Sequence, residues 1–128
     1  MVIDTHVFLW YCLDDPKLPA PIREHLKSNP GQVWVPSICL WEIVCLAERK
    51  RIAISAPDPG RAILHLFHQT RFKEATLTSE IAILSRSLPF THEDPADRFI
   101  GATAVAMCQT LATSDSRLRD LPFVSLAY

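Results

Sequence analysis

The chain opens with the stretch MVIDTHVFLW at residues 1–10, and this stretch decides the fold class. Residues 2–4 have the apolar character of a short buried strand, and the mixed segment after them has that of a helix. A strand that ends on a carboxylate and turns into a helix places that carboxylate at the carboxyl edge of a sheet, where α/β proteins bind ligands. Asp4 is therefore the first candidate site residue.

Strands and helices alternate along the rest of the 128 residues. Strands are expected at residues 33–35, 111–113 and 123–126, with a weaker extended stretch at 73–78. Helices are expected from residue 5 to about 14, at 20–28, from an N-cap at Ser37 to about Arg51, from Asp58 and Pro59 onward, from Thr78 or Ser79 to about 88, and from Asp94 and Pro95 to about 109. This alternation predicts a single α/β domain over residues 1–128, in which helices flank both faces of a small central parallel sheet.

Composition limits the kinds of function. Thirteen Lys and Arg against fourteen Asp and Glu give a net charge of -1, so no bulk positive field draws in nucleic acid. Contacts with nucleic acid must rest on local patches such as residues 49–51, or Arg117 with Arg119. There is no signal-peptide pattern, and no apolar run reaches the roughly 20 residues needed to cross a bilayer. We therefore expect a soluble protein in the cytoplasm, without a membrane partner.

The four cysteines and three tryptophans are expected to be structural. The cysteines lie in apolar segments without a Cys-x-x-Cys pair, which favours buried reduced thiols over a zinc site or disulfides. The tryptophans also lie in apolar runs, which favours core or interface positions over base stacking.

Glu42 is the only charged residue in the run at 38–47. On a helix its face also carries Ile38 and Leu46, so its carboxylate should lie among apolar neighbours. An unpaired buried carboxylate destabilises the folded protein by several kcal/mol, so a positive group is expected beside it. The ordinary alternative to a functional site is a salt bridge to Arg49 or to a distant arginine.

Asp94, Asp97 and Asp115 each have a structural alternative. Asp94 precedes Pro95 and is a good helix N-cap, which we take as its main role. Asp97 then lies in the first helical turn, where the helix dipole favours any acid. The small residue Gly101 on its face lets the helix approach the sheet and bring Asp97 towards the strand ends. Asp115 follows the strand at 111–113 and could equally be an N-cap or a turn residue.

A divalent cation is the simplest explanation of four acids at one edge of a sheet. Asp4, Glu42, Asp97 and Asp115 have no basic partners beside them in sequence, and crowded carboxylates raise one another's pKa unless a cation joins them. Oxygen ligands suit Mg²⁺ or Mn²⁺, and the chemistry that follows is phosphodiester hydrolysis by an activated water.

Several hydroxyl and imidazole groups lie near the same edge. Thr5, Thr113 and Ser114 could orient water or phosphate, although hydroxyls at turns are common. His6 and His92 could assist proton transfer, although packing is the more frequent role of such residues.

The segments DTH at 4–6, LWEI at 40–43, HEDPADR at 92–98 and TSD at 113–115 resemble the PIN-domain family, and their order and spacing resemble the VapC-type toxins of bacterial toxin-antitoxin pairs. The resemblance covers essentially the whole chain. It implies a three-layer PIN-like fold and an endoribonuclease that depends on Mg²⁺, with Mn²⁺ as a substitute. It also implies a homodimer, inhibited by a VapB-like antitoxin whose tail enters the acidic site.

By position, the resemblance implies that the catalytic acids are Asp4, Glu42, Asp97 and Asp115, with Asp4, Asp97 and Asp115 as metal ligands. Asp94 falls on a position that is often acidic in this subgroup, and Arg98 could contact RNA or pair with an acid. Candidate substrate-binding residues are Thr5, Asp94, Arg98, Thr113 and Ser114. The alternatives are an RNA-processing or DNA-directed nuclease, and a non-catalytic binding module. Strand 2–4 ends in a single Asp followed by Thr, which disfavours a receiver-like pocket with its adjacent acid pair.

Overall fold

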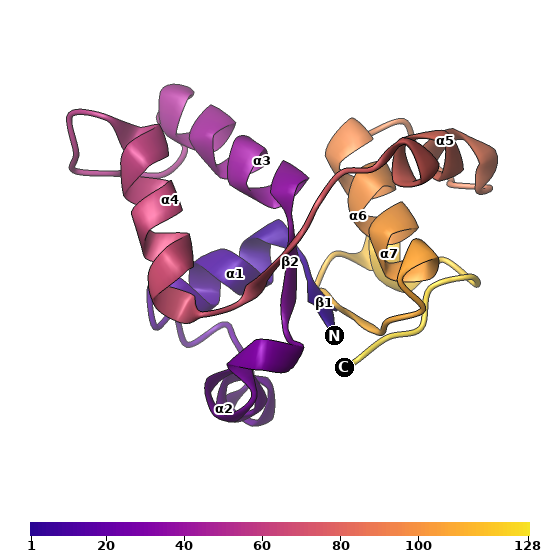
Figure 1. Cartoon of the computed structure of the whole chain (residues 1–128), viewed down its shortest axis with the longest axis horizontal. Helices are drawn as coiled ribbons and strands as arrows, with labels where there is room; N and C mark the ends of the chain where they lie inside the picture. Colours follow the sequence, from indigo (N-terminus) through magenta and orange to yellow (C-terminus); the bar gives the residue numbers. More distant parts are fainter.

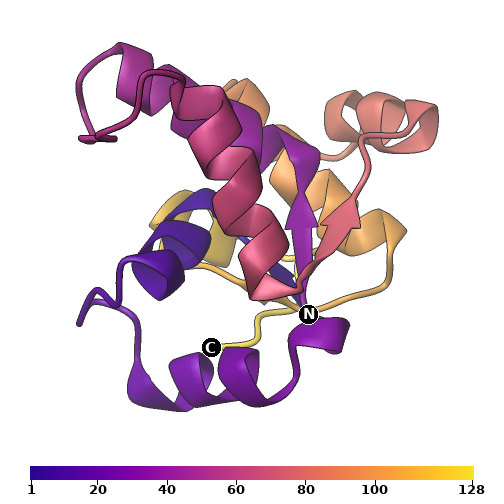
Figure 2. The ribbon, with the colours of Figure 1, turned by 60° about the vertical axis from the view of Figure 1, so that its left-hand side comes forward.

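Four short strands form one parallel sheet in the order β3-β2-β1-β4 in the computed structural model, which describes residues 1–128. The strands are β1 (Val2–Ile3), β2 (Trp34–Pro36), β3 (Lys73–Ala75) and β4 (Leu111–Ala112). β1 pairs in parallel with β2 on one side and with β4 on the other, and β3 pairs in parallel with β2 at the edge. Figure 2 shows the β2 and β3 arrows side by side and pointing the same way. The predicted α/β class with a small parallel sheet is confirmed.

Helices flank the strands on two sides. They are α1 (Thr5–Cys12), α2 (Ala20–Ser28), α3 (Ser37–Glu48), α4 (Pro59–Thr70), α5 (Ser79–Ser87), α6 (Pro95–Ala106) and α7 (Ser116–Arg119), with a 3-10 turn, η1 (Pro30–Gln32), before β2. In Figure 1, α1, α3 and α4 lie on one side of β1 and β2, and α5, α6 and α7 lie on the other. None of these helices combines the length and the apolar character that a membrane span requires.

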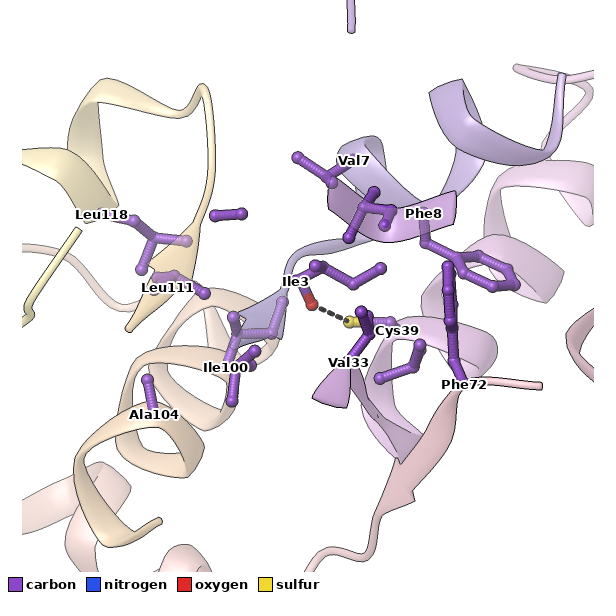
Figure 3. Packing of buried hydrophobic residues seen from close by; sticks show 14 of the residues in the cluster. Ile3, Val7, Phe8, Val33, Cys39, Phe72, Ile100, Ala104, Leu111 and Leu118 are labelled. Atoms are coloured by element: carbon purple, nitrogen blue, oxygen red, sulfur yellow. Dashed lines mark hydrogen bonds between the residues drawn. The ribbon is translucent and has the colours of Figure 1, made fainter. Parts of the chain in front are cut away.

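The apolar core surrounds β1, and this fixes the residue that follows β1. Val2 and Ile3 are fully buried, as expected of a parallel strand covered on both faces. Figure 3 shows Val33, Cys39 and Phe72 to one side of Ile3, with side chains of α6 and β4 to the other, and the Cys39 thiol donates to the Ile3 carbonyl. The backbone N–H of Asp4 donates to Ala112 O at 3.1 Å. Asp4 therefore starts from a rigid, buried position.

Two predicted helix ends and one predicted strand differ from the structure by the most. The helix expected to reach Arg51 ends at Glu48, and Lys50 is in the left-handed region with φ 56°. The helix expected to reach residue 109 ends at Ala106, and here too a residue just beyond the helix, Cys108, is in the left-handed region, with φ 51°. Residues 123–126 do not form a strand, since a turn ties Val124 N to Leu121 O and only a single bridge joins the segment to β4.

Ser37 is the first residue of α3 and not its N-cap, and its hydroxyl donates to Glu74 Oε1 at 2.7 Å. This bond ties the start of α3 to β3. A second correction concerns Gly101, whose missing side chain makes room for the ring of Phe90 rather than for a strand: a Cβ there would lie 2.9 Å from Phe90 Cε1.

The cysteines and tryptophans differ in part from the expectation. All four cysteines are free, but only Cys39 is buried, and Cys108 is exposed. Trp10 and Trp34 are half-buried, whereas Trp41 is 57% exposed and is not a core residue.

Candidate active site

One small cavity, of about 30 Å³, collects the four acids that the sequence singles out. Its lining residues are Asp4, Thr5, His6, Glu42, Asp97, Ile100, Asp115 and Arg117. They come from the start of α1, from α3, from α6 and from the start of α7, which are far apart in the sequence. The parallel sheet brings these segments together at the carboxyl ends of its strands.

Asp4 is buried and firmly held. It is the N-cap of α1, and its Oδ1 accepts from Val7 N at 2.7 Å. The hydroxyl of Thr113, which is fully buried just after β4, donates to its other oxygen, Oδ2. Burial raises the pKa of Asp4, and the two hydrogen bonds oppose that rise without cancelling it. The carboxylate is therefore fixed by neutral donors in a site that disfavours its charge.

Glu42 is held by a hydroxyl and not by an arginine. Thr5 Oγ1 donates to Glu42 Oε2 at 2.5 Å. Glu42 is half-buried, and the alternative of a salt bridge to Arg49 or to a distant arginine is not realised. Ile38 and Leu46, the apolar neighbours predicted on its helix face, are themselves only half-buried.

Asp94 and Asp97 follow one another at the start of α6. Asp94 caps the helix, accepting from Ala96 N at 3.0 Å and from Asp97 N at 3.4 Å, so the predicted capping role is confirmed. Asp97 is buried, and burial together with the charge of Asp94 raises its pKa to about 7. Its Oδ2 is buried and has no hydrogen-bond partner, although a guanidinium nitrogen of Arg117 lies 2.8 Å away as an ion-pair partner.

Asp115 has both a capping role and a place in the cavity. It is the N-cap of α7 and accepts from Arg117 N at 2.9 Å. The hydrogen bond from the Arg117 side chain lowers the pKa of Asp115. Asp115 can therefore cap α7 and line the acidic cavity at the same time.

Arg117 is the residue of this site that the sequence reading missed. Its Nη2 lies 2.8 Å from Asp97 Oδ2 and 2.9 Å from Asp115 Oδ2, and its Nη1 lies 3.7 Å from Asp94 Oδ2. These acids raise the pKa of Arg117. The premise that no basic residue stands beside the acids was wrong, because Arg117 is only two residues from Asp115. That spacing was the available signal.

Arg98 and Ser114 do not line the cavity, although both are candidates for substrate binding. Arg98 is buried and donates to Ser85 O at 2.8 Å and to His92 O at 2.9 Å, with Glu93 at 3.5 Å. Because the guanidinium is already bound inside the protein, this environment favours the pairing with an acid over the contact with RNA, the two roles expected of Arg98. Ser114 is exposed and forms no hydrogen bond through its side chain.

The two histidines near the edge have different positions. His6 is exposed and lines the cavity, with its ring 6.0 Å from that of Trp10. His92 is half-buried, and its Nε2 lies 3.9 Å from Asp97 Oδ2. Only His6 is open to a molecule that approaches from solvent.

The chemistry of the site suits a hard divalent cation. Its donors are carboxylate and hydroxyl oxygens, and Asp97 Oδ2 is buried without a hydrogen bond. Burial raises the pKa of both Asp4 and Asp97, a rise that a bound cation would reverse. As the side chains stand, no three acidic, histidine or cysteine groups are arranged as metal ligands. The donors therefore fit the ion in their chemistry, and the Arg117 guanidinium, which pairs with Asp97 and Asp115, is the positive charge with which an ion would compete.

Comparison with known proteins agrees with this architecture. Ribonuclease VapC22 of Mycobacterium tuberculosis (strain ATCC 25618 / H37Rv) is 29% identical over 123 residues, covering 94% of this chain and 90% of that protein. VapBC2 from Rickettsia felis, solved with a DNA fragment from its promoter, has a TM-score of 0.71 at 17% identity, covering 98% of this chain and 95% of that chain. DNA-bound VapBC from Salmonella typhimurium has a TM-score of 0.75 at 20% identity, covering 98% and 94%. The PIN domain family matches residues 1–124. This chain belongs to the PIN domain family.

Proposed function

We propose that this PIN domain protein is a metal-dependent endoribonuclease that acts in the cytoplasm as the toxin of a toxin-antitoxin pair. The observation that carries the proposal is the convergence of Asp4, Glu42, Asp97 and Asp115 on one cavity at the carboxyl edge of the sheet. The likeness to Ribonuclease VapC22 over nearly the whole chain supports RNA as the substrate. The fold shared with two VapBC assemblies supports a VapB-like antitoxin as the partner. A homodimer is proposed from the family resemblance alone.

Asp4, Asp97 and Asp115 are the residues that would hold the ion, which we propose to be Mg²⁺, with Mn²⁺ as a substitute. When bound, such an ion lowers the pKa of water and offsets negative charge on a phosphate. The three carboxylates belong to separate elements, so each must be oriented by its own neighbours. Thr113 and Val7 N do this for Asp4, and the start of α7 does it for Asp115.

Glu42 is suited to proton transfer from the attacking water. Thr5 binds Oε2 and fixes the orientation of the carboxylate, so Oε1 is left to accept a hydrogen bond and then the proton. Glu42 belongs to the α3 side of the cavity, and the Arg117 side chain pairs with acids of the α6 and α7 side. No arginine or lysine therefore pairs with the carboxylate that is to act as general base.

The dimensions of the cavity limit how RNA approaches. A volume of about 30 Å³ holds an ion or a water but not a nucleotide, so the phosphodiester must lie across its mouth. Exposed His6 is available to the substrate there. Single strands and loops, whose backbone can be drawn towards a small site, fit this geometry better than a regular duplex.

A labelled-RNA cleavage assay tests the enzyme assignment. Purified protein should cut RNA in the presence of Mg²⁺ or Mn²⁺ and should stop when EDTA removes the ion, and DNA of the same sequence should stay intact. Cleavage that ignores EDTA, or folded protein with Mg²⁺ that cuts no RNA in a total cellular extract, would contradict the proposal. Cleavage of the DNA would favour the DNA-directed alternative.

The toxin assignment needs a separate test in cells. Expression should arrest growth, and co-expression of a small protein encoded by the neighbouring gene should relieve the arrest. Mapping cleavage sites across cellular RNA after a short pulse of expression would identify the target. Cleavage without growth arrest would instead favour an RNA-processing role.

A further inference from the structure

The acidic cavity already contains a cation that belongs to the protein. Arg117 Nη2 lies within 3 Å of one oxygen of Asp97 and one of Asp115, at 2.8 and 2.9 Å, and its Nη1 is 3.7 Å from Asp94. An ion held by Asp97 and Asp115 would compete with the guanidinium for these carboxylates. Arg117 itself lines the cavity of about 30 Å³, so an ion inside it would lie against the guanidinium, and the two positive charges would repel each other.

Other basic groups near the site cannot take the place of Arg117. Arg98 is bound to Ser85 O and His92 O in the interior, and Arg119 donates to Thr113 O at 2.9 Å and to the carbonyl of Tyr128. Arg117 is the only arginine or lysine within ion-pair distance of Asp97 or Asp115. Apart from the imidazole of His92, whose Nε2 lies 3.9 Å from Asp97 Oδ2, Arg117 is therefore the only internal counter-ion of these two acids.

Arg117 is free to leave, whereas its partners are not. The Arg117 side chain is 49% exposed, but that of Asp97 is only 10% exposed. Arg117 lies on α7, a helix of four residues, and its guanidinium can swing into water without disturbing the core. Release costs little on the arginine side, because water solvates the half-exposed guanidinium well. Asp97, in contrast, stays buried and still needs a positive neighbour.

We propose that Arg117 is an exchangeable counter-ion, which neutralises the acids in the metal-free protein and which a divalent cation must displace in order to bind. This inference rests on the metal site of the proposed function and adds a means of control to it. It means that the affinity for metal is set by a competition inside the chain as well as by the ligands. The displaced guanidinium remains at the mouth of the cavity, where the phosphate of an RNA strand can bind it.

The test compares metal binding by R117Q with that by wild type and by the control variant R61Q. Arg61 is exposed on α4 and pairs with none of the site acids, so R61Q makes the same change in net charge away from the cavity. Calorimetric titration with Mn²⁺ should give a dissociation constant at least about fivefold lower for R117Q than for wild type. R61Q should bind like wild type. An unchanged or weaker affinity of R117Q would overturn the proposal.

Thermal melting gives a second readout on the same variants. Without metal, R117Q should melt below wild type, since its acids lack a counter-ion, and saturating Mn²⁺ should raise its Tm more than that of wild type. An equal rise in both proteins counts against displacement.

A measurement on the wild-type protein keeps the proposal testable if R117Q does not fold. The Nε–H resonance of Arg117, assigned with R117K, should shift during a Mg²⁺ titration with the same midpoint as metal binding, because Nε donates to Asp115 Oδ1 in the free protein. A resonance that does not move while Mg²⁺ binds overturns the exchange. All these readouts are independent of RNA cleavage. Tighter metal binding by R117Q, with no RNA cleavage by wild type, would support the exchange and contradict the nuclease function. RNA cleavage by wild type, with no tighter metal binding by R117Q, would support the nuclease function and contradict the exchange.

Discussion

The cavity has two walls that hold their carboxylates in different ways. On the first wall, Asp4 and Glu42 are each held by a threonine hydroxyl, from Thr113 and Thr5. On the second wall, Asp97 and Asp115 share the guanidinium of Arg117. A neutral donor orients a carboxylate and leaves its charge in place, whereas a cation orients it and also cancels the charge. The carboxylates of the first wall are therefore always available to an incoming cation, whereas those of the second wall must first be released from the Arg117 guanidinium.

The pKa values show the same difference. Burial raises the pKa of Asp4, and the hydrogen bonds from Thr113 and Val7 N, together with nearby His6, oppose that rise without cancelling it. The hydrogen bond from Arg117 lowers the pKa of Asp115. Asp97 combines both situations, since burial and Asp94 raise its pKa to about 7 although Arg117 acts to lower it. The single positive charge of Arg117 thus does not balance the carboxylates of the second wall, and a doubly charged ion would balance them better.

The largest effect is expected from D4N on the first wall. Asn keeps an acceptor for Val7 N and the size of the side chain, but it removes the charge from the proposed metal site. Cleavage of RNA with Mg²⁺ should fall more than about 100-fold, beyond the loss typical of outer-shell residues. Thermal stability should be unchanged or higher, because a buried charge is removed. Full cleavage by folded D4N would contradict the assignment of Asp4.

The second prediction concerns pH and the second wall. The pKa of Asp97 is about 7 in the folded protein and near 3.8 when unperturbed, so the folded state holds the proton more tightly. Its contribution to stability is complete below about pH 4 and is lost as the pH rises through 7. At about 1.4 kcal/mol per pKa unit, this loss is of the order of 4 kcal/mol.

Urea unfolding of metal-free wild type and D97N between pH 4 and pH 8 measures this contribution. The free energy of unfolding of wild type should fall relative to that of D97N across this range. Saturating Mg²⁺ should reduce the fall, because the ion favours the ionised carboxylate. Parallel pH profiles for the two proteins without metal would show that Asp97 ionises normally.

The third prediction removes a neutral donor from the first wall. Thr113 is fully buried, donates to Asp4 Oδ2 and accepts from Asp115 N at 3.0 Å. T113V keeps the shape and loses both bonds, so the free energy of unfolding should fall by about 2 kcal/mol. Cleavage should fall by about tenfold as Asp4 loses its orientation. T113S is the matched control: it keeps the hydroxyl, so it should retain most of the activity, and an equal loss in both variants would point to packing instead.

Local and topological features of this sequence predict the structure correctly. Asp94 before Pro95 predicts a cap, and a cap is what the structure has. The alternation of strands and helices predicts a parallel sheet, and such a sheet brings the ends of distant strands to one edge, which is why Asp4 and Asp115 line the same cavity.

The direction in which a side chain points could not be predicted from the sequence. Arg117 stands two residues after Asp115, but whether it turns towards Asp97 depends on the short helix α7, which has no periodic pattern. Arg98 has the same charge and stands beside Asp97 in sequence, yet it points into the interior because consecutive helical residues face different directions. Position along the chain could not distinguish these two arginines.

The smallest effect is expected at Ser114, whose neighbour Thr113 carries the same functional group. Ser114 is exposed and unbonded, so S114A should change the free energy of unfolding by less than about 0.5 kcal/mol. It should leave the affinity for Mn²⁺ unchanged, and any effect on RNA cleavage should appear in KM and not in kcat, because an exposed hydroxyl can touch the substrate but does not orient Asp4. A fall in kcat comparable with that of T113V would show that solvent-exposed hydroxyls also hold the first wall. Adjacent hydroxyls with different effects would instead show that burial against Asp4, and not the presence of a hydroxyl at the strand end, makes Thr113 part of the site.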